Sequence, residues 1–427
     1  MNDDSLAMPP APNPTADPAD RPFTEVNGRV YRHPRQPVAV ICADGCGPEY
    51  LEAAIAHGVA PTLGRMSRDG FHATARAVVP TFTNPNNISI VCGAPPSVHG
   101  ISGNYYLDRR TGREVMMLDE AQMRADTIPG RLSQEHVRVA VVTAKRKLRL
   151  ALARGLRGIA CSAEDPAEAF DLINEGRPFA SAPDKYSADL SLFVLDAGIR
   201  LLERRAADLI YLSLSDFVQH AHAPDTPEAL AFMAALDARV ARLTMLGAIV
   251  GIVADHGMTD MSHADGSPNV VFVQDVLNAA FGHGSTRVIC PITDPFGRHH
   301  AALGGFVRVY AQQDGVAAGD VVRALQDVPG IEAAVVGADA CDRFDLPLAE
   351  EADVVVFAEK GVALGAGAAD HDLSQLAGQR LRSHGGPAEQ AVPFLLSHPV
   401  TASYAARASG GLWTYDIFDY ALNGVVA

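Results

Sequence analysis

Four short apolar segments, separated by helical patterns, are the feature that most constrains the fold of this chain. Each is rich in β-branched and other apolar residues, which is typical of a strand buried on both faces of a sheet. They are QPVAVICADG (36–45), VRVAVVTAK (137–145), ADLIYLSLSD (207–216) and LGAIVGIVADHG (246–257). Helical patterns precede the last two, at 187–206 and 226–246. Strands that alternate with helices predict an α/β fold, with a mostly parallel sheet between two layers of helices.

Three of these predicted strands end in an aspartate, namely Asp44, Asp216 and Asp255. The carboxyl ends of parallel strands meet at one edge of the sheet, and open α/β folds bind their ligands there. We therefore expect the three carboxylates to lie close together. Because like charges repel, such a cluster requires a cation or shared protons.

The segment 271–375 has a different pattern and is expected to form an inserted, smaller α+β cap. It contains short β-α-β units whose strands do not end in aspartate, and residues 116–135 are a further candidate part of it. The first 24 residues (1–24) are acidic and Pro-rich, so we expect a disordered tail. Three segments remain for the catalytic α/β core: 36–115, 136–270 and 376–427.

Composition excludes several classes of partner. The formal net charge of −15 argues against nucleic-acid binding, which needs a basic surface. No apolar run approaches the roughly 18–20 residues that span a bilayer, so membrane insertion is not expected. The N-terminus lacks the pattern of a signal peptide, and the six cysteines form no paired motif. These features predict reduced thiols and a cytoplasmic protein, and the sequence allows a homodimer without requiring one.

Histidines accompany the aspartates. Asp216 and His220 share one face if the chain turns helical after its strand. Asp255 is followed directly by His256, and His384 lies in the Gly-rich sequence SHGG. Each motif alone is better explained by a hydrogen-bonded pair or a turn than by a metal site. Together with Asp44, they supply six N and O ligands, a set that suits two zinc ions with open positions.

A turn-like stretch, VVPTFTNPNN (78–87), contains two hydroxyl groups, those of Thr81 and Thr83. Thr83 immediately precedes an Asn-Pro-Asn turn and an apolar helical pattern, where free N–H groups face anions. A threonine hydroxyl is a poor nucleophile unless a metal lowers its pKa. Thr83 is therefore the candidate nucleophile, whereas Thr81 and Phe82 are expected to shape the loop.

These motifs, in their order along the chain, resemble those of the alkaline phosphatase superfamily of two-zinc enzymes. The similarity is greatest to the nucleotide pyrophosphatase/phosphodiesterase branch, and within it to members that hydrolyse phosphonoacetate. The resemblance implies one zinc held by Asp216, His220 and His384. It implies a second zinc held by Asp44, Asp255 and His256, with Thr83 as a further ligand that becomes a phosphothreonine. Fe or Mn would suit the same donors.

The implied reaction is hydrolysis of the carbon–phosphorus bond of phosphonoacetate to acetate and phosphate. The leaving carbanion must spread its charge into the adjacent carboxylate, so cations at that carboxylate accelerate the reaction. Lys145 and Lys147 would point the same way in an extended segment, and the resemblance assigns both to this carboxylate. It also assigns Asn104, in SGNYY, to a phosphoryl oxygen. The alternatives are a solvated basic run and a turn asparagine.

Other functions stay open. A phosphodiesterase or nucleotide pyrophosphatase would use the same ligands, as would a zinc phosphatase or phosphomutase. A non-catalytic, metal-stabilised binding protein would keep the ligands but would need no hydroxyl at position 83. His299 and His300, in the predicted cap, either reach the substrate or are exposed, and we favour exposure.

Overall fold

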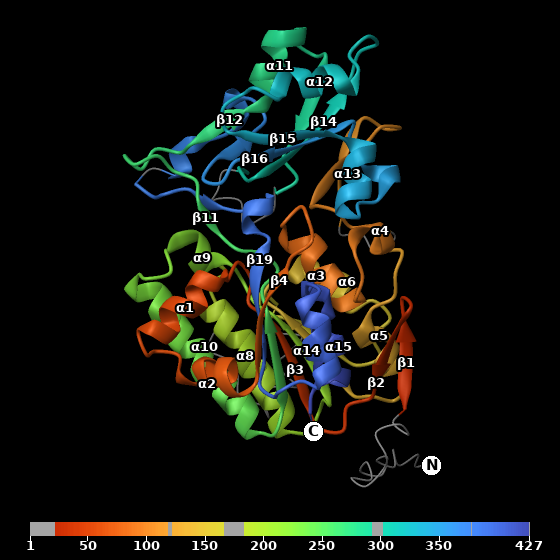
Figure 1. The fold of residues 1–427 in the computed structure, drawn as a ribbon, viewed down its shortest axis with the longest axis vertical. Helices are drawn as coiled ribbons and strands as arrows, with labels where there is room; N and C mark the ends of the chain where they lie inside the picture. Colours follow the sequence, from red (N-terminus) through yellow and green to blue (C-terminus); the bar gives the residue numbers. More distant parts are fainter. Residues whose placement is uncertain (1–21, 118–121, 166–182, 293–301, 377, 427) are drawn as a thin grey trace.

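The computed structural model describes residues 22–117, 122–165, 183–292, 302–376 and 378–426. His299, His300 and most of the predicted tail lie outside these ranges. In Figure 1 the chain forms a larger part around a central sheet and a smaller part above it. No helix in the described ranges is long and apolar enough to cross a membrane.

A seven-stranded sheet with the order β4-β19-β10-β3-β9-β7-β8 forms the centre of the larger part. The strands from β10 to β8 in this order pair in parallel, whereas β19 is antiparallel to both of its neighbours. The four predicted strands are confirmed as β3, β7, β9 and β10, which lie side by side. The strands are β3 (Val38–Cys42), β4 (Phe71–Arg76), β7 (Val139–Thr143), β8 (Ile159–Ser162), β9 (Leu209–Ser213), β10 (Ile249–Val253) and β19 (Ala391–Leu396).

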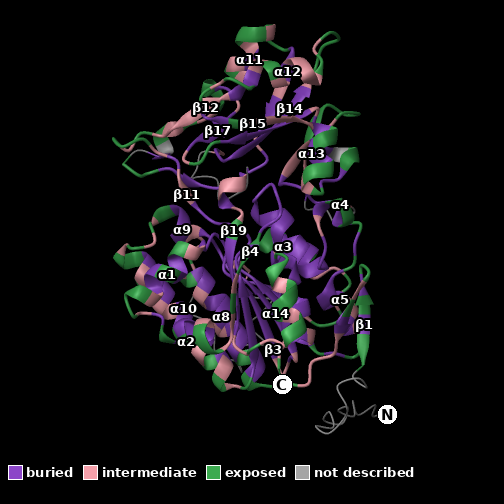
Figure 2. Cartoon of the chain, in the orientation of Figure 1, coloured by how far each residue is buried: buried purple, intermediate pink, exposed green. Residues whose placement is uncertain are grey.

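Helices pack on both faces of this sheet, as predicted. Every residue of β3, β7, β9 and β10 is buried between them, as the colours of Figure 2 show. One layer holds α1 (Pro48–Ala56), α2 (Pro61–Asp69), α8 (Ala188–Glu203) and α10 (Pro227–Met245). The other holds α3 (Thr83–Cys92), α5 (Ile128–Gln134), α6 (Arg146–Leu152) and α15 (Ile417–Asp419).

The smaller part contains a four-stranded sheet with the order β13-β14-β16-β15. Neighbouring strands are antiparallel throughout, but β14 and β15, joined by a helix, run parallel with β16 between them. The expected β-α-β unit is therefore a split one. The elements are α11 (Val273–Phe281), β13 (Thr286–Ile289), β14 (Phe306–Ala311), α12 (Ala318–Leu325), β15 (Ile331–Val336), α13 (Gly337–Phe344) and β16 (Val354–Ala358).

Short pairs of strands complete the fold. One of them, β11 with β18, lies where the chain passes between the two parts. Another, β12 with β17, lies in the smaller part, and two others form hairpins. They are β1 (Phe23–Val26), β2 (Arg29–Arg32), β5 (Tyr105–Asp108), β6 (Arg113–Met116), β11 (Thr259–Asp260), β12 (Val270–Phe272), β17 (Ala363–Gly365) and β18 (Arg382–Ser383). The remaining short helices include α4 (Pro96–His99), α9 (Phe217–Ala221) and α14 (Ala402–Ser409).

The direction of β19 decides what reaches the edge of the central sheet. Because β19 is antiparallel to β10, its first residues lie beside the last residues of β10, with Phe394 opposite Val253. The segment that precedes β19 therefore lies beside the segments that follow the parallel strands. Segments far apart in sequence converge at this one edge.

Candidate active site

All six predicted ligands lie on segments that leave the central sheet at this edge. Asp44 follows β3, Asp255 and His256 follow β10, and His384 precedes β19. After β9 the chain turns helical as predicted, and Asp216 is the N-cap of α9. The side chains of all six residues are buried.

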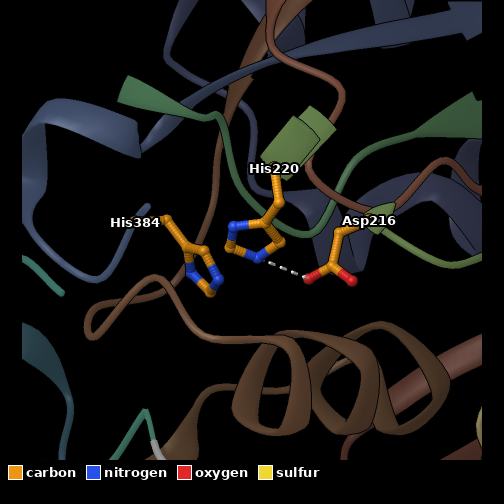
Figure 3. Close-up of side chains that lie close together, drawn as sticks. All are labelled: Asp216, His220 and His384. Carbon is orange, nitrogen blue, oxygen red and sulfur yellow. Dashed lines mark ion pairs between the residues drawn. The ribbon is translucent and has the colours of Figure 1, made fainter. Parts of the chain in front are cut away.

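The six side chains form two groups of three. In each group the potential ligand atoms lie within 4.8 Å of one another. Figure 3 shows the first group, in which the His220 and His384 rings and the Asp216 carboxylate point toward a common region. His220 Nε2 is 3.3 Å from Asp216 Oδ2. The groups are Asp216, His220 and His384, and Asp44, Asp255 and His256.

Each histidine presents one nitrogen to its group. In all three the Nδ1 atom lies at hydrogen-bonding distance from a backbone carbonyl, which can only accept, so Nδ1 carries the proton. The Nε2 atom of each ring then faces the carboxylates. The partners of Nδ1 are the carbonyls of Arg382 for His220 (2.7 Å), Gly257 for His256 (2.9 Å) and Thr81 for His384 (2.7 Å).

The carboxylates also fit a metal centre. Both oxygens of Asp44 are buried and accept no hydrogen bond among the described residues. Their charged neighbours are Lys145, with Nζ at 2.8 Å, and His256, with Nε2 at 3.2 Å. Lys145 supplies a single fixed positive charge for the three buried carboxylates of the site, and buried carboxylates are costly unless further cations compensate them. Three carboxylates and three imidazoles are donors that divalent transition metals accept, so the residues present fit two such ions.

Electrostatics within the site point the same way. Burial raises the pKa of the Asp255 carboxyl above its usual range, and the neighbouring Asp44 raises it further. Burial lowers the pKa of His256, but the carboxylates of Asp255 and Asp44 outweigh it and raise that pKa to about 9. Burial, followed by the charge of His256, holds the pKa of His384 well below its usual value. His384 is therefore neutral, as a metal ligand must be.

Thr83 lies at the junction of the two groups. It opens α3, a helix in which every residue is buried, and its own side chain is 5% exposed. Its Oγ1 is 3.4 Å from His256 Nε2 and 3.3 Å from Lys145 Nζ. Lys145 in turn lies 3.3 Å from Asp216 Oδ1, so its ammonium contacts residues of both groups. The structure thus brings Thr83 and Lys145 to the six predicted ligands.

Lys147 is placed differently from our expectation. We assumed an extended segment, but α6 begins at Arg146, with Lys145 as its N-cap. Two residues apart in a helix, side chains point roughly 200° away from each other. Lys147 is exposed, and its Nζ lies 3.8 Å from the sulfur of Met116. The expectation of a parallel lysine pair is therefore wrong for this conformation.

Asn104 is buried on a loop that contacts the smaller part of the molecule. Its backbone N–H donates to Pro291 O (3.0 Å) and its side-chain Nδ2 to Ile292 O (3.2 Å). The neighbouring Ser102 binds Arg308 of β14 through both its carbonyl and its hydroxyl. Asn104 is thus fixed by partners that are almost 200 residues away in the sequence.

Thr81 shapes the loop beside the site, as expected from the sequence, whereas the supporting role of Asn86 was missed. Thr81 Oγ1 donates to Gly386 O (2.9 Å) and accepts from Gly385 N (3.0 Å), which ties the loop after His384 to the loop before Thr83. Asn86 accepts from Val78 N (2.7 Å) and closes the turn. The consecutive asparagines of TNPNN were the only sequence signal for such roles.

Comparisons with known proteins show similarity in sequence and in fold. The family model for type I phosphodiesterase/nucleotide pyrophosphatase matches residues 38–329. A phosphonoacetate hydrolase from Sinorhizobium meliloti 1021, solved with phosphonoformate, is 41% identical, with a TM-score of 0.88 over 95% of this chain and 100% of that one. Its structure with phosphonoacetate gives 40% identity and a TM-score of 0.87 over the same shares. A murine ectonucleotide pyrophosphatase/phosphodiesterase 5 shares the fold at 16% identity, with a TM-score of 0.61 over 90% of this chain and 93% of that one.

Proposed function

This chain belongs to the type I phosphodiesterase/nucleotide pyrophosphatase family, within the alkaline phosphatase superfamily, and we propose that it hydrolyses phosphonoacetate to acetate and phosphate. The observation that carries the proposal is 41% identity, over 95% of this chain, to a phosphonoacetate hydrolase. The two buried ligand groups beside Thr83 supply the matching chemistry.

We assign one metal ion to Asp216, His220 and His384, and a second to Asp44, Asp255, His256 and Thr83. When bound, zinc would lower the pKa of the Thr83 hydroxyl and offset the negative charge of the phosphonate. In His220 and His384 the Nδ1 atom faces a backbone carbonyl, which leaves Nε2 as the atom that can bind the metal.

Thr83 gives its hydroxyl proton to solvent, its Oγ1 attacks phosphorus, the P–C bond breaks, and the electron pair of that bond stays on carbon. That charge spreads into the neighbouring carboxylate as an enolate-like dianion, and the carbon takes one proton from solvent to give acetate. Water then hydrolyses the phosphothreonine and releases phosphate. A preorganised cation contributes most where charge develops in the transition state. Lys145, 3.3 Å from Thr83 Oγ1 and 95% buried, is placed to supply such a charge.

Asn104 and Lys147 complete the proposed substrate site. Asn104 is assigned to a phosphoryl oxygen and Lys147 to the carboxylate of the substrate. Lys147 is exposed in the first turn of α6, so it reaches that carboxylate only through another side-chain conformation. We also propose residues 271–375 as the cap. Residues 116–135 are not included, because α5 within them packs against β7.

A comparison of substrates tests the proposal. The purified, zinc-loaded protein is assayed for phosphate release from phosphonoacetate, and for cleavage of an aryl phosphate and an aryl phosphodiester. We expect the highest kcat/KM with phosphonoacetate. Preferential cleavage of the diester, with no phosphate from phosphonoacetate, would establish the phosphodiesterase alternative instead. Zinc binding without turnover of any of the three would favour a non-catalytic binding protein.

A further inference from the structure

The side-chain amide of Asn87 is fully buried and joins three segments by hydrogen bonds: helix α3, the chain after β10, and strand β9. It lies one turn after Thr83 in α3. Its Nδ2 donates to Asp255 Oδ2 (3.0 Å) and to the Thr83 carbonyl (3.1 Å). Its Oδ1 accepts from Tyr211 OH and from Ser213 Oγ, both at 2.8 Å and both on β9. The two donor hydrogens and two acceptor positions of the amide are therefore all used.

The chemistry of these partners allows only one orientation of the amide. A carbonyl and a carboxylate accept hydrogen bonds, so the NH₂ group must face Thr83 O and Asp255. A flipped amide would place Oδ1 against two acceptors. The hydroxyls of Tyr211 and Ser213 donate to Oδ1 from the opposite side. They stabilise the orientation that Asp255 requires.

Of the two carboxylates in its group, Asp255 therefore accepts the larger number of hydrogen bonds from neutral N–H groups. Besides Asn87, it accepts hydrogen bonds from the backbone N–H groups of Gly45 (3.2 Å) and His256 (3.1 Å). Three of its roughly four lone-pair positions are thus occupied. One remains to face the neighbouring ligand atoms, whereas the oxygens of Asp44 face Lys145 Nζ (2.8 Å) and His256 Nε2 (3.2 Å).

We propose that Asn87, oriented by Tyr211 and Ser213, is a positioning residue that fixes Asp255 and the first turn of the helix carrying Thr83. The proposal rests on the proposed function in one respect, since it takes Asp255 as a metal ligand. It does not depend on which phosphorus compound is the substrate. Partners that orient metal ligands typically change metal affinity 10–100-fold when they are removed.

The test measures zinc affinity by competition with a chromophoric chelator, without any substrate. Asn87→Leu keeps the approximate size of the side chain and removes every hydrogen bond. We expect a zinc dissociation constant raised about 10–100-fold. Asn423→Leu is a matched control, because Asn423 also spans a carboxylate (Asp419 Oδ1, 2.7 Å), a carbonyl and a backbone N–H, but in the C-terminal segment beside β2. Its zinc affinity should equal that of the wild type.

A second variant keeps the Asn87 amide and removes the two hydroxyl groups that orient it. Tyr211→Phe with Ser213→Ala should weaken zinc binding in the same direction, by about 2–10-fold, since each hydroxyl contributes a neutral hydrogen bond. Tyr420→Phe, which removes another buried tyrosine hydroxyl, is its control. The proposal is overturned if both test variants bind zinc as tightly as the wild type, or if the controls lose as much affinity. Failure of phosphonoacetate turnover alone would refute the proposed function and leave this inference standing.

Discussion

Thr81 and Thr83 have different partners in the structure, so we expect their substitution by alanine to have different effects on turnover and stability. Thr83→Ala removes the proposed nucleophile from a position beside His256 and Lys145. We expect a folded protein that still binds zinc but loses turnover by about 10⁴-fold or more. Thr81→Ala removes two buried hydrogen bonds to the Gly385–Gly386 loop, which should cost about 1–3 kcal/mol of stability.

Measurements of kcat, bound zinc and the free energy of unfolding distinguish the two variants. Thr81→Ala should retain most of its kcat once loaded with zinc. Equal loss of turnover in both variants would show that Thr83 acts through the loop rather than as a nucleophile.

The two lysines should also respond differently to substitution. Lys145 is buried against Asp44, Asp216 and Thr83, so Lys145→Ala should reduce turnover of every substrate, by about 10²-fold or more. Lys147 is exposed, and Lys147→Ala should affect phosphonoacetate far more than an aryl phosphodiester that lacks a carboxylate. The ratio of kcat/KM values for the two substrates is the readout. If Lys147→Ala lowers both equally, its assignment to the carboxylate fails.

At the scale of single residues, the sequence predicted the location of those side chains that follow the end of a strand. Asp44, Asp216 and Asp255 were found because a residue at the end of a parallel strand has a known location in the fold. The orientation of Lys147 was not predicted, because it depends on a helix that starts one residue after Lys145. The role of Asn87 was not predicted either, since its partners Asp255 and Tyr211 are more than 100 residues away.

Among the elements, β14 links the smaller part of the molecule to the proposed substrate loop. Arg308 of β14 is fully buried and pairs with Glu351, with Nε at 2.6 Å from Oε1 and Nη2 at 2.8 Å from Oε2. The same guanidinium donates to the carbonyls of Ser102 and Tyr105, on either side of Asn104. The loop that carries Asn104 thus depends on a buried ion pair between β14 and the segment before β16.

Arg308→Met leaves Glu351 buried without its partner, which should lower the free energy of unfolding by about 3–5 kcal/mol. The loop should also loosen, so we expect a higher KM for phosphonoacetate in the protein that remains folded. Denaturant unfolding and steady-state kinetics measure both effects. Adding Glu351→Leu removes the uncompensated charge and should restore stability but not KM. Restoration of both would show that the ion pair matters for folding alone.

The elements were predictable where their patterns are strong. The four buried strands are continuous apolar runs and the helices α8 and α10 carry long periodic patterns, and all were found. The direction of β19 was not predictable, because strand direction is decided by which neighbours the chain meets and leaves no mark in apolar composition. Yet this direction is what brings His384 to the edge where the aspartates lie.

For the molecule as a whole, the metal ions should connect stability with pH. The site gathers three carboxylates from β3, β9 and β10 with a histidine that precedes β19, so bound ions hold together segments from the whole length of the chain. Removing them with a chelator should lower the melting temperature. At metal concentrations about 1,000-fold above Kd, the expected loss is about 4 kcal/mol.

The pH dependence of metal binding follows from the same residues. In the metal-free protein the pKa of His256 lies at about 9, and that of Asp255 lies above its usual range, so both hold protons at neutral pH. A ligand must lose its proton to bind a metal. Metal uptake at pH 7 should therefore release protons, and apparent affinity should increase as the pH is raised toward about 9. Adding zinc to stripped protein in a weakly buffered solution, with a pH electrode, measures the release directly. Affinity that stays constant between pH 6 and pH 9, without proton release, would mean that these two residues are not ligands.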